Sequence, residues 1–378
     1  MKLPFREHHL MQLLNGYQQQ SLPLDLFVNH YFRANLALGS KDRGYIAETV
    51  YALIRWKGLL DHLCGESASW EERLGRFQHP SFTDAKQDVT IPAHIRISFP
   101  QVLFERILAS YGEQKTLEIC SILNQSAPTT VRINPLKTTR ETMLKRWQSL
   151  YEVSPCARSE YGILFHKKLN FFSLAEFQEG LFEVQDEGSQ LLGQLVKAEP
   201  KQRVLDYCAG SGGKTLTFAP NMQGTGQIYL HDIRLHTLHE ARKRLKRAGI
   251  QNAQILPDTD TVKLKKLKKQ MDWVLVDAPC TGTGTLRRNP DMKWRYEDAM
   301  LQQLVSQQRV IFEKALSFMK PDGRIVYATC SLLQEENQKQ VEHFIKTYNL
   351  VVEGEPFSTL PVAGGMDGFF GVVLRHKS

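Results

Sequence analysis

The sequence contains 378 residues, with 48 lysines and arginines against 40 aspartates and glutamates, which gives a formal net charge of +8. Its length allows two or three domains with a substantial core, and its positive charge suits a polyanionic partner without requiring one. No apolar stretch follows Met1 and no apolar run reaches the roughly eighteen residues of a membrane helix, so we expect neither a secretory signal nor a membrane span.

The beginning of the chain has the pattern of a helical module. Apolar residues recur at three-to-four spacing over residues 18–38 and 41–63, and Ser40 stands where it can cap the second of these helices. We therefore predict a helical module over residues 1–75.

Residues 76–127 are predicted to hold a linker and further helices. The polar stretch 71–90 includes a His-Pro pair and indicates a linker or a long loop. Helical patterns resume after Pro92 and continue to Ser126.

Residues 128–180 have the pattern of a small α/β subdomain. Strands are expected at Thr129–Asn134 and Gly162–Phe165, on either side of a helix at Arg140–Leu150.

The remaining residues, 181–378, alternate strands and helices in the order expected of a mostly parallel sheet with crossover helices. The predicted fold class is therefore α/β, with a Rossmann-like domain at the end of the chain. Its strands are expected at Arg203–Asp206, Gln227–Leu230, Ala253–Leu256, Trp273–Asp277, Gly323–Ala328 and Phe369–Leu374.

A glycine-rich turn follows the first of these strands and opens a helix, a setting in which the backbone can approach a ligand closely. A phosphate-binding P-loop would need glycine where Cys208 stands, and a dinucleotide fingerprint would need its third glycine where Thr215 stands. The candidate cofactor-binding residues of this turn are Cys208, Ala209, Gly210, Ser211, Gly212, Gly213 and Lys214.

Two aspartates close the next strands. Asp232 ends the second strand, where such folds place a carboxylate against ribose hydroxyls, and Asp258 follows the third, where it could contact an adenine or its ribose. Either one alone is more often a loop cap. Their placement at successive strand ends favours an adenosyl cofactor.

Two cysteines stand where later strands end. Cys280 closes an Asp-Ala-Pro-Cys motif that begins at Asp277, and Cys330 lies in Ala-Thr-Cys-Ser. Loops at the carboxyl ends of strands form the ligand crevice of an open α/β sheet, and a thiolate can add to an electron-poor carbon.

The six cysteines contain no Cys-x-x-Cys pair, so we expect no metal. In the cytoplasm, where we expect the protein, the two thiols would stay reduced.

Basic residues gather in three clusters. The clusters at 242–247 and 263–269 fit a solvated helix face as well as they fit a contact with a polyanion. The third follows Cys280 closely, where positive charge could hold a phosphate backbone beside the thiols. Its members are Arg287, Arg288, Lys293 and Arg295.

The chain resembles the RNA 5-methylcytosine methyltransferases, the family that includes the bacterial ribosomal RNA cytosine methyltransferase RsmB and the eukaryotic Nop2/Sun proteins. The resemblance covers about residues 95–378 and implies a class I S-adenosylmethionine-dependent methyltransferase fold. It rests on Phe182–Leu191, Asp206–Thr215, Val276–Thr285, Arg288–Arg295, Tyr327–Ser331 and Asp367–Phe370.

The resemblance extends more loosely to the front of the chain. Residues 1–75 are similar to a NusB-type helical RNA-binding module, and residues 128–180 to a small RNA-recognition-like subdomain, where Arg132 is a candidate RNA contact. One departure is the glycine turn, in which Gly210 and Ser211 replace the family's usual Ala-Pro. Because both later glycines and the lysine remain, we expect cofactor binding to survive this change.

The family's mechanism implies a role for each residue of the candidate site. Cys330 would supply the thiolate that adds to carbon 6 of cytosine, which activates carbon 5 toward the methyl group of S-adenosyl-L-methionine. Cys280 would assist release of the product. Asp277 would hold the cytosine edge and contact the cofactor, and Lys214 would lie near both and support Cys330.

The expected substrate is RNA, with small-subunit ribosomal RNA preferred, and the expected state is a monomer without a membrane partner. Two alternatives stay open. One is a tRNA cytosine methyltransferase, which often carries an additional RNA-binding module. The other is an RNA-binding ribosome-assembly factor that keeps the fold without turnover, although the intact Cys330, Cys280, Asp277 and Lys214 argue against it.

Overall fold

The computed structural model describes residues 3–377. The chain divides into two compact units. The first runs to Ser126 and also contains Thr285–Asp298, and the second consists of Ala127–Gly284 and Ala299 onward. Among the described residues, no helix combines the length and apolar character needed to cross a bilayer.

The first unit is helical. Its buried apolar core joins side chains such as Leu13, Val50 and Leu53, and Trp294 from the later segment packs against it. The helices are α1 (Phe5–Gln18), α2 (Leu24–Ala34), α3 (Ser40–Arg55), α4 (Lys57–Cys64), α5 (Trp70–Gln78), α6 (Pro80–Ala85), α7 (Ala93–Arg96), α8 (Gln101–Tyr111) and α9 (Glu113–Leu123), together with the 3-10 turn η4 (Met292–Arg295).

Two sequence expectations for this unit were wrong. The stretch 71–90 is largely helical: Ser69 and Glu72 form a capping box that starts α5, and the His79 side chain caps α6. Since both helices bury apolar side chains, the segment is more than a linker. Ser40 is also the first residue of α3, with Gly39 at the cap position and no side-chain capping bond.

The second unit begins with a four-stranded antiparallel sheet in the order β2-β3-β1-β4. Trp147 packs against the sheet residues Ile163 and Phe182 in its core. Because β4 is its edge strand, the small subdomain extends past residue 180, where we expected it to end. The elements are β1 (Thr129–Ile133), α10 (Arg140–Trp147), β2 (Val153–Pro155), β3 (Gly162–Phe165), η1 (Phe171–Ser173), α11 (Ala175–Gln178) and β4 (Phe182–Val184).

The large sheet has the order β10-β12-β9-β8-β5-β6-β7, with β11 paired to β12. The strands β5 to β9 are parallel neighbours, and β12 runs antiparallel to β9. All six predicted strands are present, and only the short β10 and β11 escaped prediction. The strands are β5 (Arg203–Asp206), β6 (Gln227–Asp232), β7 (Ala253–Pro257), β8 (Met271–Asp277), β9 (Met319–Thr329), β10 (Leu350–Val352), β11 (Phe357–Thr359) and β12 (Phe369–His376).

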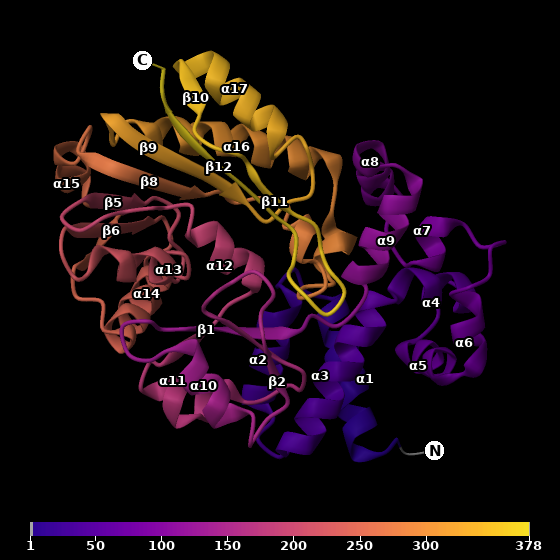
Figure 1. Ribbon diagram of the computed structural model, residues 1–378. Coiled ribbons are helices and arrows are strands. Elements are labelled where there is room, and N and C mark those ends of the chain that lie inside the picture. The colour runs from indigo at the N-terminus through magenta and orange to yellow at the C-terminus, as the bar shows by residue number, and fades with distance from the viewer. Residues whose placement is uncertain (1–2, 378) are drawn as a thin grey trace. The chain divides into compact units, whose positions relative to one another are not determined.

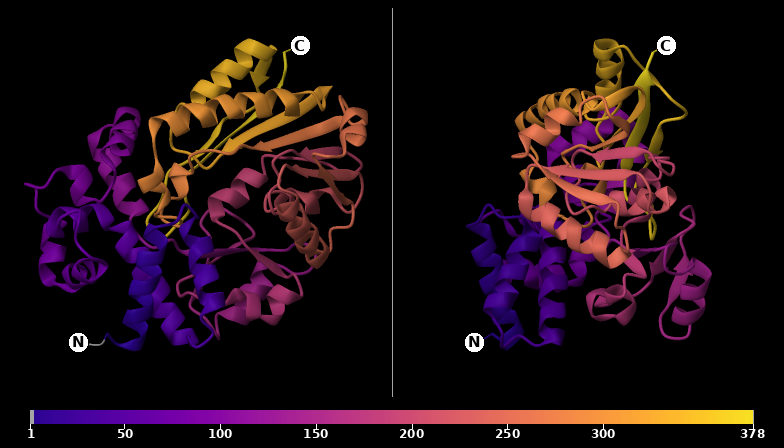
Figure 2. Two further views of the ribbon diagram at one scale, coloured as in Figure 1. Left: turned by 180° about the vertical axis from the view of Figure 1, so that it is seen from behind. Right: turned by 90° about the vertical axis from the view of Figure 1, so that its left-hand side faces the viewer.

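Helices cover both faces of this sheet, as Figures 1 and 2 show. Leu238 and Leu245 of α14 pack on one face, and Phe312 of α16 and Phe344 of α17 pack on the other. The α/β class with a Rossmann-like domain is thereby confirmed. The helices are α12 (Glu187–Gly193), α13 (Thr215–Phe218), α14 (Leu235–Ala248), α15 (Thr261–Lys266), α16 (Asp298–Leu316) and α17 (Gln338–Tyr348), with the 3-10 turns η2 (Ala219–Met222) and η3 (Thr283–Thr285).

Candidate active site

The sheet order brings the sequence motifs to one edge. Strands β5, β8 and β9 are consecutive neighbours, with Asp206 opposite Leu275 and Asp277 opposite Ala328. Because these strands are parallel, the residues after each of them emerge on the same side of the sheet. The glycine turn and both cysteine loops therefore meet there.

The two cysteine thiols lie side by side. Cys280 Sγ is 3.4 Å from Cys330 Sγ, and both residues are free and partly exposed. The hydrogen bond from the Cys280 thiol lowers the pKa of Cys330, and the Lys214 ammonium adds to this effect. The same hydrogen bond, followed by burial, raises the pKa of Cys280 well above its ordinary value. The pair is thus asymmetric, with Cys330 the easier thiol to ionise and Cys280 its donor.

Lys214 and Asp277 form an ion pair beside the thiols. Burial alone would lower the pKa of Lys214, but the charge of Asp277 and the hydrogen bond to it outweigh burial and raise that pKa. Lys214 therefore stays an ammonium close to Cys330. The four predicted catalytic residues are brought together, although they come from three separate segments of the sequence.

The glycine turn has a conformation that depends on glycine. Gly210 and Gly212 have φ of 51° and 77°, in the left-handed region. The amide of Gly210 donates to Asp232 Oδ2 over 2.9 Å. Arg234 also binds Asp232, with its backbone amide and its Nε 2.8 and 3.0 Å from Oδ1. Asp232 thus fastens the turn to the end of β6, a structural role that its sequence position alone did not reveal.

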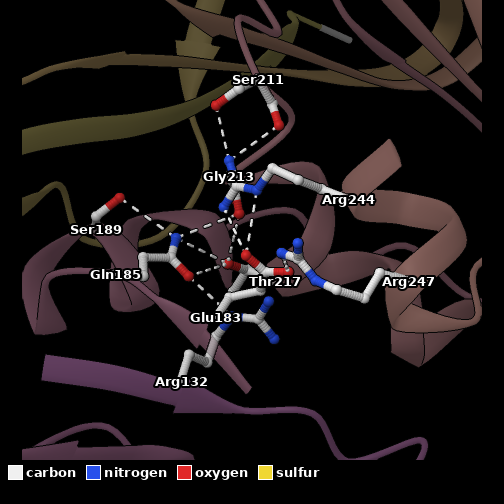
Figure 3. A network of polar contacts seen from close by, with 9 residues as sticks. All are labelled: Arg132, Glu183, Gln185, Ser189, Ser211, Gly213, Thr217, Arg244 and Arg247. Carbon is white, nitrogen blue, oxygen red and sulfur yellow. Dashed lines mark hydrogen bonds and ion pairs between the residues drawn. The ribbon is translucent and has the colours of Figure 1, made fainter. Parts of the chain in front are cut away.

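A polar network supports the turn from the side of the small sheet, as Figure 3 shows. Arg244 of α14 donates to Ser211 O and Ser211 Oγ over 3.0 and 2.7 Å. Glu183 of β4 pairs in turn with Arg244 and Arg247 and is almost fully buried. Gln185 donates to Gly213 O over 3.3 Å. In addition to the contact from Asp232, this network therefore holds the turn at Ser211 and at Gly213.

The other predicted cofactor residues differ in exposure. Asp258 follows β7 with its carboxylate largely exposed, 3.4 Å from His231 Nε2. Cys208 is a poor nucleophile because burial raises the pKa of its thiol strongly. Ala209 is buried beside it. Ile233, which directly follows Asp232, is an exposed apolar residue that we had not singled out. An apolar side chain next to the carboxylate at the end of the second strand is the signal that could have identified it.

Direct RNA contact was a wrong prediction for three of the five basic candidates. Arg132 is buried, and its Nε donates to Gln185 Oε1 over 2.8 Å. Its burial lowers the pKa of the guanidinium to about 10. Lys293 and Arg287 are each 1 % exposed. Side chains enclosed in this way have no surface left for a phosphate.

Lys293 and Arg295 instead form hydrogen bonds within the helical unit. Lys293 Nζ donates to Arg55 O over 2.7 Å, to Ser98 O over 2.5 Å and to Asn124 Oδ1 over 2.7 Å. Arg295 donates to Ser21 O over 3.0 Å and keeps part of its side chain exposed, and Arg288 is also partly exposed. RNA contact therefore stays a prediction for Arg288 and Arg295 alone.

Known proteins are similar to this chain in sequence and in fold. Residues 193–370 match the family model described as 16S rRNA methyltransferase RsmB/F, and residues 99–171 match the ferredoxin-like domain of RsmF/B-like methyltransferases. A crystal structure of the protein PH0851 has 22% identity and a TM-score of 0.81 over 99% of both chains, which supports the fold alone.

Two curated relatives carry the family assignment. The probable ribosomal RNA small subunit methyltransferase B of Synechocystis sp. is 32% identical over 74% of this chain and 67% of that protein. The ribosomal RNA small subunit methyltransferase B of Sodalis glossinidius is 30% identical over 86% of this chain and 75% of that protein. With the paired cysteines and the glycine turn at one sheet edge, these matches show that the chain belongs to the RsmB/F methyltransferase family.

Proposed function

We propose that this protein transfers a methyl group from S-adenosyl-L-methionine to carbon 5 of a cytosine in RNA, with small-subunit ribosomal RNA as the substrate. The observation that carries the proposal is the asymmetric thiol pair, in which Cys330 has a lowered pKa and lies 3.4 Å from Cys280. The names of the curated relatives support a ribosomal RNA substrate.

The chemistry explains why the site needs a thiolate. Carbon 5 of cytosine is too weak a nucleophile to take a methyl group directly. When the Cys330 thiolate bonds to carbon 6, the ring electrons shift and carbon 5 becomes enamine-like. S-adenosyl-L-methionine would supply an electrophilic methyl group to this carbon, with the bond between its sulfur and that methyl breaking to leave S-adenosylhomocysteine. The proton on carbon 5 leaves to water, and the electrons of that bond expel Cys330 from carbon 6.

The neighbouring side chains have complementary tasks in this scheme. Lys214 stabilises the Cys330 thiolate before attack, because its ammonium lies near the sulfur and keeps its proton. Asp277, paired with Lys214, would hold the edge of the cytosine and contact the cofactor. The Cys280 thiol donates a hydrogen bond to the Cys330 sulfur as that sulfur regains negative charge during release.

The cofactor would bind against the glycine turn, residues 208–214, with Asp232 and Asp258 toward its ribose and adenine. The Arg234 side chain that now covers Asp232 is 59% exposed, so it can give way to ribose hydroxyls. Ile233, exposed beside Asp232, offers an apolar contact for the adenine ring.

The RNA would present an unpaired or flipped cytosine, since a base inside a duplex cannot reach a thiol at a sheet edge. The helical unit and the small sheet are the proposed RNA-binding elements, with Arg288 and Arg295 as remaining candidates. The exposed lysines of the second basic cluster, which include Lys265 and Lys266, could add contacts to the RNA backbone.

A methyl-transfer assay tests the proposal. Purified protein is mixed with radiolabelled methyl donor and, separately, with ribosomal RNA from cells that lack this protein and with transfer RNA. We expect label in ribosomal RNA, as 5-methylcytosine after nuclease digestion. Label in transfer RNA alone would show that transfer RNA, not ribosomal RNA, is the substrate. Tight RNA binding without methyl transfer to either RNA would contradict the enzyme proposal and favour an assembly factor.

The roles of the two thiols can be separated by substitution. Cys330→Ala should abolish transfer and form no covalent complex, because no thiolate remains to attack carbon 6. Cys280→Ala should instead accumulate a protein–RNA adduct that survives SDS, because attack is intact and release is slowed. Normal turnover by Cys280→Ala would contradict the release role.

A further inference from the structure

A buried carboxylate binds the residue that follows Cys280 and has no part in the scheme above. Glu336 is 0% exposed, in the loop that follows Cys330. Its Oε1 accepts a hydrogen bond from the backbone amide of Thr281 over 2.9 Å, and its Oε2 accepts one from Thr281 Oγ1 over 2.5 Å. Burial of a carboxylate costs solvation free energy. The burial of Glu336 at this position therefore calls for an explanation.

Glu336 and Gln308, which contact each other, form hydrogen bonds to the chain on both sides of Cys280. Thr281 directly follows this cysteine and donates twice to Glu336. Pro279 directly precedes it, and its carbonyl accepts from Gln308 Nε2 over 3.0 Å. The same Gln308 nitrogen is 3.0 Å from Glu336 Oε1. The backbone that carries the Cys280 thiol is therefore anchored before and after the sulfur.

The same cluster reaches the loop of Cys330. Ser331, the residue after this cysteine, has its Oγ 3.3 Å from Thr281 Oγ1 and 3.1 Å from Thr283 Oγ1. The carbonyl of Cys330 accepts from the amide of Gly284 over 2.9 Å. Thr281 is thus shared between Glu336 and the Cys330 loop, which couples the positions of the two sulfurs.

The charge of Glu336 has a further effect on the pair. Burial raises the pKa of the Glu336 carboxyl, while hydrogen bonds from Ser331, Thr281 and Gln308 oppose that rise and favour the ionised form. After the hydrogen bond to Cys330, burial and the charge of Cys330, the Glu336 charge is among the causes that raise the pKa of Cys280. It also acts to raise the pKa of Cys330, where the hydrogen bond from Cys280 outweighs it. The effect is to keep Cys280 a thiol that can donate.

We propose that Glu336 is a positioning residue that holds Cys280 as a hydrogen-bond donor to Cys330 through Thr281, and so serves the release half of the reaction. Glu336 touches neither base nor cofactor in this proposal. It rests on the proposed cytosine methylation, because release of a Cys330 adduct is the step on which it acts.

Glu336→Gln in the full chain tests this role. The change preserves shape but removes the charge and leaves one oxygen for two Thr281 donors. We expect about 10- to 100-fold slower multiple turnover, the factor that corresponds to loss of a hydrogen bond to a charged group. The first methyl transfer should remain near the normal rate, and an SDS-stable adduct should accumulate as in Cys280→Ala. Glu335→Gln is the matched control, since this neighbour pairs with Lys339 at the surface and its loss should leave turnover and adduct unchanged.

Three outcomes distinguish the possibilities. Normal multiple turnover by Glu336→Gln would overturn the inference. Loss of the first transfer together with loss of the adduct would also overturn it, because the residue would then be a general support of the site. If unsubstituted protein transferred no methyl group, the proposed function itself would fail, whatever the variants did.

A second variant covers the case in which Glu336→Gln does not fold, as judged by its circular dichroism and melting curve. Thr281→Val removes the hydroxyl, with its contacts to Glu336 and Ser331, and keeps the backbone contact to Glu336. We expect it to accumulate the adduct to a smaller extent at an unchanged first-transfer rate. Wild-type release by a folded Thr281→Val, with Glu336→Gln unfolded, would count against the inference.

Discussion

Asp206, at the end of β5, shows how burial changes the chemistry of a single residue. Its side chain is buried, Thr215 Oγ1 donates to its Oδ2 over 2.7 Å, and its Oδ1 has no hydrogen-bond partner within residues 3–377. Burial raises its pKa from 3.8 to about 7, against the opposing hydrogen bond from Thr215. The folded protein therefore binds this proton more tightly than the unfolded chain does.

This shift predicts a pH dependence of stability. Between about pH 4 and pH 7 the folded state holds a proton that the unfolded state has lost, so the free energy of unfolding should fall as pH rises, with the full loss above pH 7. Asp206→Asn removes this titration, and its stability relative to the unsubstituted protein should increase from pH 5 to pH 8. Urea unfolding at several pH values measures it.

The exposed Asp322 provides the control for that experiment. Asp322→Asn should change stability little. If the difference between Asp206→Asn and the unsubstituted protein were the same at pH 5 and pH 8, a folded-state pKa near 7 would be contradicted.

Among the elements, the glycine turn is supported by side chains from outside itself. Two left-handed glycines leave it with high conformational freedom in the unfolded chain. Arg244 restrains Ser211 and Gln185 restrains Gly213, from α14 and from the end of β4 respectively (Figure 3). The small sheet thereby contributes to the geometry of the proposed cofactor site.

Arg244→Met should weaken binding of S-adenosyl-L-methionine. The substitution removes two hydrogen bonds to Ser211 and the ion pair between Arg244 and Glu183, so we expect a Kd about 5- to 20-fold higher, in proportion to one or two net hydrogen bonds. Isothermal titration calorimetry measures the Kd. Lys243→Met is the control, because Lys243 pairs with Glu240 on the exposed side of α14. An unchanged Kd for Arg244→Met, with only a lower melting temperature, would show that the turn does not need this support.

Element type was largely predictable where strands and glycine turns carry strong local signals. The alternation of apolar strands and the motifs at their ends located Lys214, Asp277, Cys280 and Cys330 at one sheet edge. The capped α5 and α6 were missed because their many polar residues conceal the buried Trp70 and Phe82. Such short helices are held by caps and a few apolar contacts, which a polar composition hides.

Long-range polar contacts were beyond prediction from the sequence. Nothing local indicates that Glu336 accepts from Thr281, or that Lys293 finds three acceptors on three different segments. The basic cluster after Cys280 therefore resembled an RNA contact, although the fold encloses two of its members. A charged residue is equally hydrophilic in sequence whether it meets solvent or a buried acceptor.

For the molecule as a whole, the main difference from the sequence-based prediction is that the segment Thr285–Asp298 belongs to the helical unit. The chain leaves the catalytic unit after Gly284, contributes this segment to the helical unit and then returns. Trp294 packs in the helical core, where a side chain at Gly58 would stand 2.7 Å from its ring. The helical unit is thus completed by residues that directly follow the Cys280 motif.

Lys293→Met should destabilise the helical unit. Three buried acceptors would lose their donor, with a cost of about 1–3 kcal/mol after relief of the lysine's own desolvation. Urea unfolding followed by tryptophan fluorescence measures it. Lys41→Met, at an exposed position of α3, should change stability little. Equal stability of the two variants would contradict a structural role for Lys293.

The covalent bond between Cys330 and the pyrimidine is the central claim, and peptide mapping of the trapped complex tests it most directly. Cys280→Ala protein is incubated with methyl donor and substrate RNA, the SDS-stable adduct is digested with protease and nuclease, and the nucleotide-bearing peptide is identified by mass spectrometry. We predict a methylated cytidine nucleotide attached to the sulfur of Cys330. A nucleotide on any other residue, or no adduct from a variant that still binds the RNA and the methyl donor, would contradict the account.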